Sequence, residues 1–325
     1  MAGATRSETE DEVPLRNGRR RWSRSQPVAF YLLALVLVIL LPALLVSLIL
    51  LSNSNRAQEE VVRSLTNTTV QAIGLSVDRE VAGMVTTLRV LSTSEELTEG
   101  DFAAFHQRSR VAMAGSGAYM LVLDRQFHQI LNTRQRYGEQ LGLTSDPASA
   151  AETLERGTTT VSGLFFGRTA NQWVFNVLVP VPDNRDAALL ALTRNASSLA
   201  PVLQTRQLPS GWHAALIDAN NLVIAATPDT GMVTGTVLPM RQTQDHAAGE
   251  WRRERLDGDM VVTAEWASGL SGWRVIAWAA VDTVERPLGQ SLLLVWPHLT
   301  GLIALAMICF GVSYVVFMRQ EVRAD

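Results

Sequence analysis

Two long stretches of the chain contain no Asp, Glu, Lys or Arg: Pro27 to Asn55 near the start and Pro287 to Met318 near the end. A helix needs about 20 apolar residues to cross a hydrocarbon core of about 30 Å. The pattern predicts two transmembrane helices, at residues 28–51 and 289–318. A cleaved signal peptide fits the first stretch less well, because signal-peptide cores reach only about 15 residues and no small-x-small cleavage site follows.

The distribution of arginine predicts how these helices are oriented. Arginines are concentrated before the first apolar stretch and follow the second, at Arg16, Arg19, Arg20, Arg21, Arg24, Arg319 and Arg323. On the other side of the first stretch, Arg56 and Arg63 are offset by Glu59 and Glu60. Positive charge near the ends of a span marks the cytoplasmic side. Both termini are therefore expected in the cytoplasm, and residues 53–286 outside the membrane.

Residues 56–92 have the spacing of one long helix. Their apolar side chains recur every three or four positions in a narrow stripe: Val70, Ile73, Val77, Val81, Met84, Leu88 and Leu91. Two interpretations of the stripe stay open. It is either a seam with a second copy of the chain, as in a coiled coil, or the face by which the helix packs on its own sheets.

After a second amphipathic helix near residues 99–114, the pattern changes to short strands and turns, and it occurs twice. Strands at 118–124 and 128–133 flank a turn that begins at Asp124, and strands at 212–218 and 222–227 flank a turn that begins at Asp218. Further strands follow in each unit, at 172–179 and 186–193 and then at 260–266 and 272–279. The fold class is therefore α+β, with two similar lobes of mainly antiparallel sheet behind a long helix.

These patterns divide the chain into seven segments. We expect a basic cytoplasmic segment (1–27), a first transmembrane helix (28–51), a long signalling or dimerisation helix (52–98), a membrane-distal lobe (99–208), a membrane-proximal lobe (209–288), a second transmembrane helix (289–318) and a short cytoplasmic tail (319–325).

The sequence contains no recognisable catalytic constellation. Its five histidines do not have metal-ligand spacing, and there is no P-loop, no dinucleotide-binding fingerprint and no nucleophile elbow. The single cysteine, Cys309, lies in the second apolar stretch, which leaves the predicted outer segment without disulfides or thiolate metal sites. We expect no catalytic domain in this chain, no cofactor and no nucleic-acid partner.

The layout and several short motifs resemble a known family. The motifs are Leu91-Ser-Thr-Ser-Glu-Glu-Leu97, Gly100-Asp101-Phe102 with Phe105, Leu123-Asp124 with Leu131-Asn132-Thr133, Val161-Ser-Gly-Leu-Phe165, and Val177 with Val179-Pro180-Val181. Together with a long helix and two PAS-like lobes between two spans, they resemble the double Cache extracytoplasmic sensor domains of bacterial two-component histidine kinases, of the HWE type and related ones. The resemblance covers about residues 28–318.

The resemblance implies a receptor in a bacterial plasma membrane. It implies a small-molecule ligand in the membrane-distal lobe, a homodimer embedded in membrane lipid, and a signal passed through the second span to a cytoplasmic kinase or other output protein. No kinase, cyclase or chemoreceptor output segment is found before Asp325, so the chain is expected to be either a short stand-alone sensor or one part of a longer protein. A membrane-anchored partner-binding or assembly protein without a small-molecule ligand is the alternative function.

The candidate ligand residues lie on the strands and covering loop of the membrane-distal lobe: Tyr119, Asn132, Arg134, Arg168, Trp173, Asn176 and Arg194. Arg168, in the loop after residue 166, could hold a carboxylate in bidentate fashion. The amino-acid-binding signature of related sensors is not matched, so an amino acid is not predicted, and the number of arginines suggests an organic anion as the ligand. The alternative is that Arg134 and Arg168 are solvated loop residues and that Trp173 belongs to the core.

Overall fold

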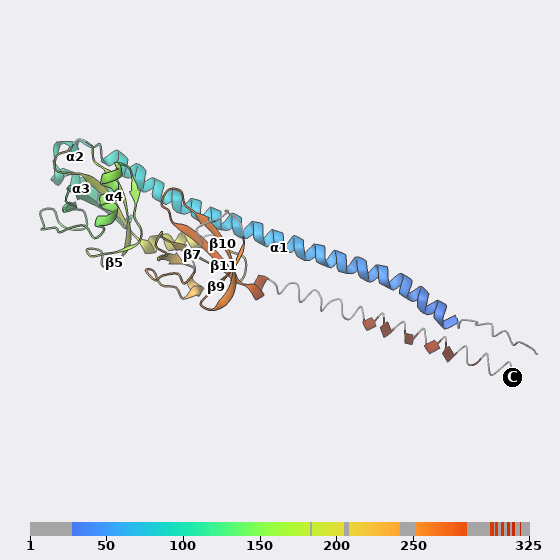
Figure 1. Ribbon diagram of the computed structural model, residues 1–325. Helices are drawn as coiled ribbons and strands as arrows, with labels where there is room; N and C mark the ends of the chain where they lie inside the picture. The colour runs from blue at the N-terminus through green and yellow to red at the C-terminus, as the bar shows by residue number, and fades with distance from the viewer. Residues whose placement is uncertain are drawn as a thin grey trace, which may run out of the picture. The chain divides into compact units, whose positions relative to one another are not determined.

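A computed structural model describes residues 28–182, 184–204, 208–240 and 251–284, with scattered positions between 300 and 319. Contacts within the chain separate residues 51–292 from the two end segments, 1–50 and 293–325. Residues 51–292 contain both predicted lobes, which are the parts coloured from cyan to orange in Figure 1. The fold class is confirmed as α+β, with a long N-terminal helix and two antiparallel sheets.

The predicted membrane helices are not confirmed. No helix in the described part of the chain combines the length and hydropathy of a membrane span. The first predicted span falls on the beginning of helix α1 (Val28–Leu91). The second, at residues 289–318, lies mostly outside the described residues.

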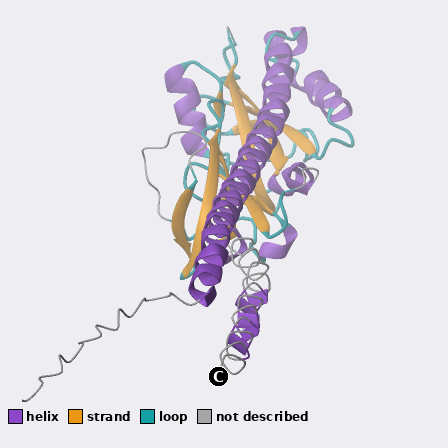
Figure 2. Cartoon of the chain, turned by 90° about the vertical axis from the view of Figure 1, so that its right-hand side faces the viewer, coloured by secondary structure: helices purple, strands orange, loops and turns teal. Residues whose placement is uncertain are grey.

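The apolar stripe of helix α1 is buried against other parts of the same chain. The stripe residues from Val70 to Leu91 are at most 8% exposed and belong to one core that also contains residues of both sheets. Figure 2 shows the helix lying across the strands of the lobes. Packing on its own sheets is therefore the correct interpretation of this stripe, because these side chains are not available to a second copy.

The distal lobe contains a sheet of six strands with the order β2-β1-β6-β5-β3, in which β4 also pairs with β5. Its elements are α2 (Glu95–Glu99), α3 (Phe102–Ala112), β1 (Ala118–Leu123), β2 (Gln129–Asn132), α4 (Pro147–Arg156), β3 (Thr160–Val161), β4 (Phe165–Gly167), β5 (Gln172–Pro180), β6 (Leu189–Asn195), a 3-10 turn η1 (Ala196–Leu199) and α5 (Ala200–Gln204). The sequence patterns did not predict helix α4 or the short strands β3 and β4.

The proximal lobe repeats this order with five strands, β8-β7-β11-β10-β9. They are β7 (Trp212–Ile217), β8 (Val223–Ala226), β9 (Arg252–Leu256), β10 (Asp259–Ala267) and β11 (Arg274–Ala280), with a 3-10 turn η2 (Pro228–Thr230) after β8. All pairings in both sheets are antiparallel. A turn at Asp257-Gly258 joins β9 to β10.

The two lobes are structural repeats down to individual hydrogen bonds. Asp124 and Asp218 each accept backbone N–H groups within the turn that they begin. Thr133 accepts the N–H of Met120 at 2.9 Å, and Thr227 accepts that of Ala214 at 3.2 Å. The sequence repeat therefore reflects a shared hairpin geometry, since a short polar side chain satisfies backbone donors that the turn leaves unpaired.

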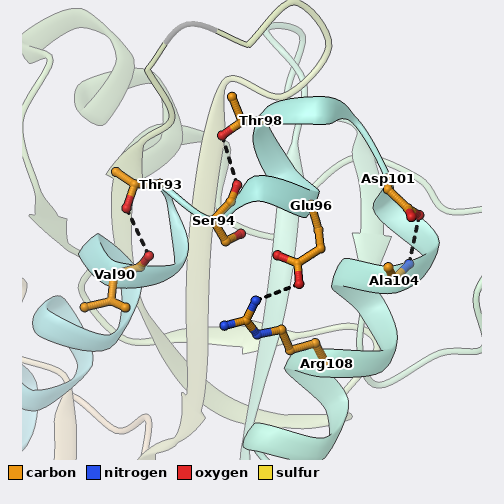
Figure 3. Close-up of polar contacts among 8 residues, drawn as sticks. All are labelled: Val90, Thr93, Ser94, Glu96, Thr98, Asp101, Ala104 and Arg108. Atoms are coloured by element: carbon orange, nitrogen blue, oxygen red, sulfur yellow. Dashed lines mark hydrogen bonds and ion pairs between the residues drawn. The ribbon is translucent and has the colours of Figure 1, made fainter.

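The tip of the distal lobe is held by helix caps, shown in Figure 3. Asp101 is the N-cap of α3 and accepts the N–H of Ala104 at 3.0 Å. Arg108 of α3 pairs with Glu96 of α2 at 2.6 Å. Side-chain acceptors at a helix start replace the missing intrahelical carbonyls. These local bonds fix how the chain turns from α1 into the sheet.

Candidate ligand-binding site

A row of polar side chains crosses four adjacent strands on one face of the distal sheet. Tyr119 of β1 lies opposite Thr193 of β6, and Thr193 lies opposite Asn176 of β5. On the other side of β1, Leu121 lies opposite Asn132 of β2. Residues that face each other across antiparallel strands point to the same side of the sheet. The strands therefore assemble a polar strip from residues that are far apart in the sequence.

Hydrogen bonds connect this strip to the start of α4. Thr193 donates to the side-chain oxygen of Asn176 at 2.6 Å, and the amide nitrogen of Asn176 donates to Asp146 at 3.4 Å. Asp146 also caps α4 by accepting the N–H of Ser149 at 3.1 Å. Burial raises the pKa of the Asp146 carboxyl above its ordinary value of 3.8. Asp146 thus places a carboxyl group one hydrogen bond behind the strip.

A small cavity of about 10 Å³ lies over the strip. It is lined by Tyr119, Leu121, Gln129, Asn132, Thr144, Ser145, Phe165, Gly167, Thr169, Asn176 and Thr193. Such a volume accommodates about one water molecule. The lining is rich in hydroxyl and amide groups and contains no charged side chain among the described residues. Burial also raises the pKa of the Tyr119 hydroxyl, which therefore stays neutral.

Arg168 ties together two segments beside the cavity. Its guanidinium donates to the carbonyl oxygens of Leu143 at 2.8 Å and Thr144 at 3.1 Å. Its backbone N–H and its Nε both donate to the hydroxyl of Ser145, at 3.2 and 3.3 Å. These four bonds join the loop before α4 to the turn after β4, and this loop together with residues 164–168 is called the cover of the cavity. A ligand larger than water requires this cover to move.

The structure brings three of the seven predicted ligand residues together in the lining: Tyr119, Asn132 and Asn176. Arg134 lies beside them, with its guanidinium carbon 5.5 Å from the centre of the Tyr119 ring. Arg168 lies in the cover, where its donors are occupied by the chain's own oxygens.

The other two predicted residues have partners outside the cavity. Arg194 forms an ion pair with Glu80 of α1 at 2.7 Å. Trp173 packs against Gly235 of the proximal lobe, where a Cβ atom would lie only 2.1 Å from the indole ring. Trp173 also meets the ring of Phe166 edge-on, at 5.8 Å. These two side chains connect the distal lobe to α1 and to the proximal lobe.

Several residues of the site were missed by sequence reasoning. Gln129, Thr193 and the hydroxyl-bearing residues Thr144, Ser145 and Thr169 all line the cavity. A signal for Asp146 was present, because Asp followed by Pro is a common start of a helix, with the proline at its first position. Thr193 carried no signal of its own, since one polar residue in an apolar strand is common.

The cover of the cavity is also joined to the proximal lobe. The N–H of Leu164 donates to the Asp218 carboxylate at 2.8 Å, and the indole N–H of Trp273 donates to the carbonyl oxygen of Ser162 at 3.1 Å. The Trp273 ring meets Phe175 of the distal sheet edge-on at 4.9 Å. Leu164 lies one residue before Phe165, which lines the cavity. Movement of the cover is thereby mechanically connected to the second lobe.

Comparisons with known proteins agree at the level of the fold. No family model matches the sequence, and no curated protein matches it. Among solved structures, the ligand-binding domain of the Pseudomonas fluorescens chemoreceptor CtaA with L-isoleucine has a TM-score of 0.54 at 13% identity, covering 71% of this chain and 97% of that one. The ligand-binding domain of the Campylobacter jejuni chemoreceptor Tlp3 with 4-methylisoleucine has a TM-score of 0.54 at 11% identity, covering 70% and 94%.

The ligand-binding domain of Mlp24 with asparagine gives the same TM-score of 0.54 at 12% identity, covering 71% of this chain and 98% of that chain. Because the identities are low, these likenesses establish the architecture and not the ligand. The resemblance to double Cache sensors noted in the sequence is confirmed for the fold: the chain carries the double Cache arrangement of a long helix and two PAS-like lobes.

Proposed function

We propose that this protein is a membrane-bound sensor that binds a small molecule in its distal lobe. The observation that carries the proposal is the polar strip across four strands, enclosed by a cover that is bonded to the second lobe. Convergent polar groups in an enclosed site are typical of ligand recognition. An assembly protein would not need a cavity of this kind, because partner surfaces are exposed.

The lining favours a neutral or zwitterionic ligand over an organic anion. Arg168 and Arg194 are engaged with carbonyl oxygens and Glu80, and Arg134 lies over the Tyr119 ring. Two described charged groups are bonded to lining residues: the Arg168 guanidinium, whose donors are used by Ser145 and Thr144, and the carboxyl group of Asp146, which accepts from Asn176. A carboxylate attracts an ammonium group and repels an anion. Free amino acids meet this requirement, and the chemoreceptor domains with this fold were solved with amino acids bound.

Binding would be transmitted through the cover. The closed cavity holds about 10 Å³, so a bound amino acid displaces the Arg168 bonds that close it. The displaced segment contains Leu164, which is bonded to Asp218 of the proximal lobe. A ligand acts on a two-state protein only through different contacts in the two states. Here the contacts that differ are those between the cover and the proximal lobe.

The remaining parts of the proposal concern the membrane and the output. We place residues 53–286 outside a bacterial plasma membrane and both ends in the cytoplasm, on the evidence of the arginine distribution. A dimer and a cytoplasmic kinase or other output partner complete the proposed receptor. Because the α1 stripe is buried within the chain, a dimer must use another face, and Leu65 and Leu75 are apolar residues of α1 that remain about half exposed, at 50% and 49%.

Calorimetric titration of the full chain with single L-amino acids and with succinate tests the ligand class. We expect at least one amino acid to bind and succinate not to bind. Asn176→Ala should weaken binding about tenfold or more, because it removes a buried amide from the lining. Arg108→Gln, which changes an exposed ion pair at the tip of the lobe, is the matched control and should bind as the parent does. Succinate binding that depends on Arg168 would contradict the proposed ligand class.

A further inference from the structure

A second hollow lies in the proximal lobe, away from the distal cavity. Its volume is about 810 Å³, within the range of small-molecule sites. It lies between the α1 segment around residues 54–63, the chain before β7, the start of β9 and the segment after β11. None of its lining residues belongs to the distal site.

Its walls are apolar and aromatic. Val62 of α1 faces a wall that contains Trp212, Trp251, Val262 and Val284. The rings of Trp212 and Trp251 lie 5.1 Å apart at an angle of 45°. The indole N–H of Trp251 is buried and has no hydrogen-bond partner among the described residues, which is a costly state for a polar group in a protein interior. Two indoles give an apolar ligand a large, rigid contact surface.

The charged groups of the lining have an excess of positive charge. Arg63, Arg252 and Arg253 contribute to it, against one described acidic residue, Glu59. Arg63 is partly buried, and in the described part of the chain no hydrogen bond or ion pair engages its guanidinium. An arginine guanidinium presents paired N–H donors that match a carboxylate. An apolar hollow with one available guanidinium therefore suits a molecule with an apolar body and one acidic end.

We propose that this hollow is a second binding site, for an amphipathic monocarboxylate whose acid group pairs with Arg63 and whose apolar body lies between Val62 and the Trp212–Trp251 pair. Such a ligand would bridge α1 and the proximal sheet. It would bind independently of the distal ligand, because the two sites share no residue.

The test uses decanoate as the probe. Decanol and decylamine are the comparison compounds, because they have a similar shape but a different charge. All three are titrated into the full chain in lipid nanodiscs, with protein-free nanodiscs as the blank. Decanoate should bind about tenfold tighter than either of the others, and Arg63→Gln should remove that advantage. Equal binding of decanol or decylamine by the parent would overturn the proposal, as would unchanged decanoate binding by Arg63→Gln.

Three further variants separate this site from a general effect on folding. Glu59→Gln removes the acidic residue of the lining and should strengthen decanoate binding. The gain should be only about twofold, because Glu59 is exposed and charge interactions at the surface are weak. Trp251→Phe should reduce the fluorescence quenching caused by 10-bromodecanoate, because bromine quenches an indole that it contacts. Arg108→Gln, at the exposed tip of the distal lobe, should leave decanoate binding unchanged. Quenching that Trp251→Phe does not alter would show that decanoate binds elsewhere and would overturn the proposal, as would loss of decanoate binding in Arg108→Gln.

Discussion

The carboxylate of Asp218, in the proximal lobe, accepts the backbone N–H of Leu164, in the cover of the distal cavity, at 2.8 Å. Asp218 is completely buried, and its other oxygen accepts the N–H groups of Asn220 and Leu222 at 2.8 Å each. Gly163 lies so close that a Cβ atom would be 2.8 Å from the carboxylate. One side chain therefore both builds the β7–β8 turn and holds the cover of the other lobe.

Asp218→Ala should lower the free energy of unfolding by about 3 kcal/mol, because it leaves backbone donors unpaired in a buried place. The loss should be accompanied by faster hydrogen exchange at the Leu164 amide, which no longer has an acceptor. Chemical denaturation and exchange measured by mass spectrometry would detect the two effects.

Asp124→Ala is the matched control, since Asp124 has the same position in the distal repeat. It accepts the N–H groups of Gln126 and His128 at 2.8 Å each, and its side chain is 28% exposed. We expect a smaller loss, about 1 kcal/mol, because water can replace these bonds, and no change at the Leu164 amide. Equal exchange at Leu164 in both variants would show that Asp218 does not hold the cover.

A glycine pair on α1 tests how closely the helix packs on the proximal sheet. A Cβ atom at Gly74 would lie 2.0 Å from the ring of Trp266. Gly74→Ala should therefore destabilise the protein by about 1–3 kcal/mol, although alanine is the better helix former. Thermal unfolding of the purified chain measures the change.

Gly83→Ala supplies the comparison on the same helix. Nothing lies within 4 Å of a Cβ atom at Gly83, so only the helix propensity changes. We expect a gain of about 1 kcal/mol. If both variants were stabilised, the close contact between α1 and Trp266 would be wrong.

Much of the fold could be predicted from the sequence because its signals are local. Short apolar runs located β1 and β10 within one or two residues, and the matching turns at Asp124 and Asp218 revealed the repeat. Helix α4 was not predicted from the sequence, because it is short and has only two fully buried residues, Ala150 and Thr153. Periodicity could not decide the role of the α1 stripe, because apolar residues have the same spacing in a dimer seam and in a helix face that packs on the chain's own sheets.

The candidate site was only partly predictable, and alternation explains one error. Trp173 and Asn176 are three residues apart on β5, so they point to opposite faces of the sheet and do not share a cavity. Arg194 is likewise next to Thr193 on β6 and points away from the strip. The role of Arg168 depended on tertiary structure, because its acceptors at Leu143 and Thr144 lie more than twenty residues earlier in the chain.

The proposed membrane topology predicts the behaviour of two reporter fusions. A reporter that is active only outside the membrane should work when fused at Gly211, and one that is active only in the cytoplasm should work at Asp325. The reason is the arginine excess before residue 28 and after residue 318. Cytoplasmic activity of a Gly211 fusion would reverse the proposed orientation of the sensor.

The pH dependence of stability should reveal the raised pKa of the Asp146 carboxyl. Burial raises the pKa of this carboxyl in the folded protein above the ordinary value of 3.8, so the folded state holds the proton more tightly than the unfolded state does. The resulting contribution to stability is fully present below pH 3.8 and is lost as the pH rises through the higher folded pKa. Asparagine does not titrate and is an equally good N-cap for α4, so Asp146→Asn should keep the helix but lack this contribution.

The measurement is the melting temperature of parent and Asp146→Asn at a series of pH values from about 3.5 to 7. The parent should lose stability relative to the variant as the pH increases, because only the parent must bury a charge. Asp101→Asn is the matched control, since Asp101 caps α3 in the same way but is exposed at the surface. Its melting temperature measures what replacing an N-cap aspartate by asparagine does to helix capping alone. If the curves of parent and Asp146→Asn were parallel instead, the pKa of this carboxyl would be the same in the folded and unfolded protein, and burial would not raise it.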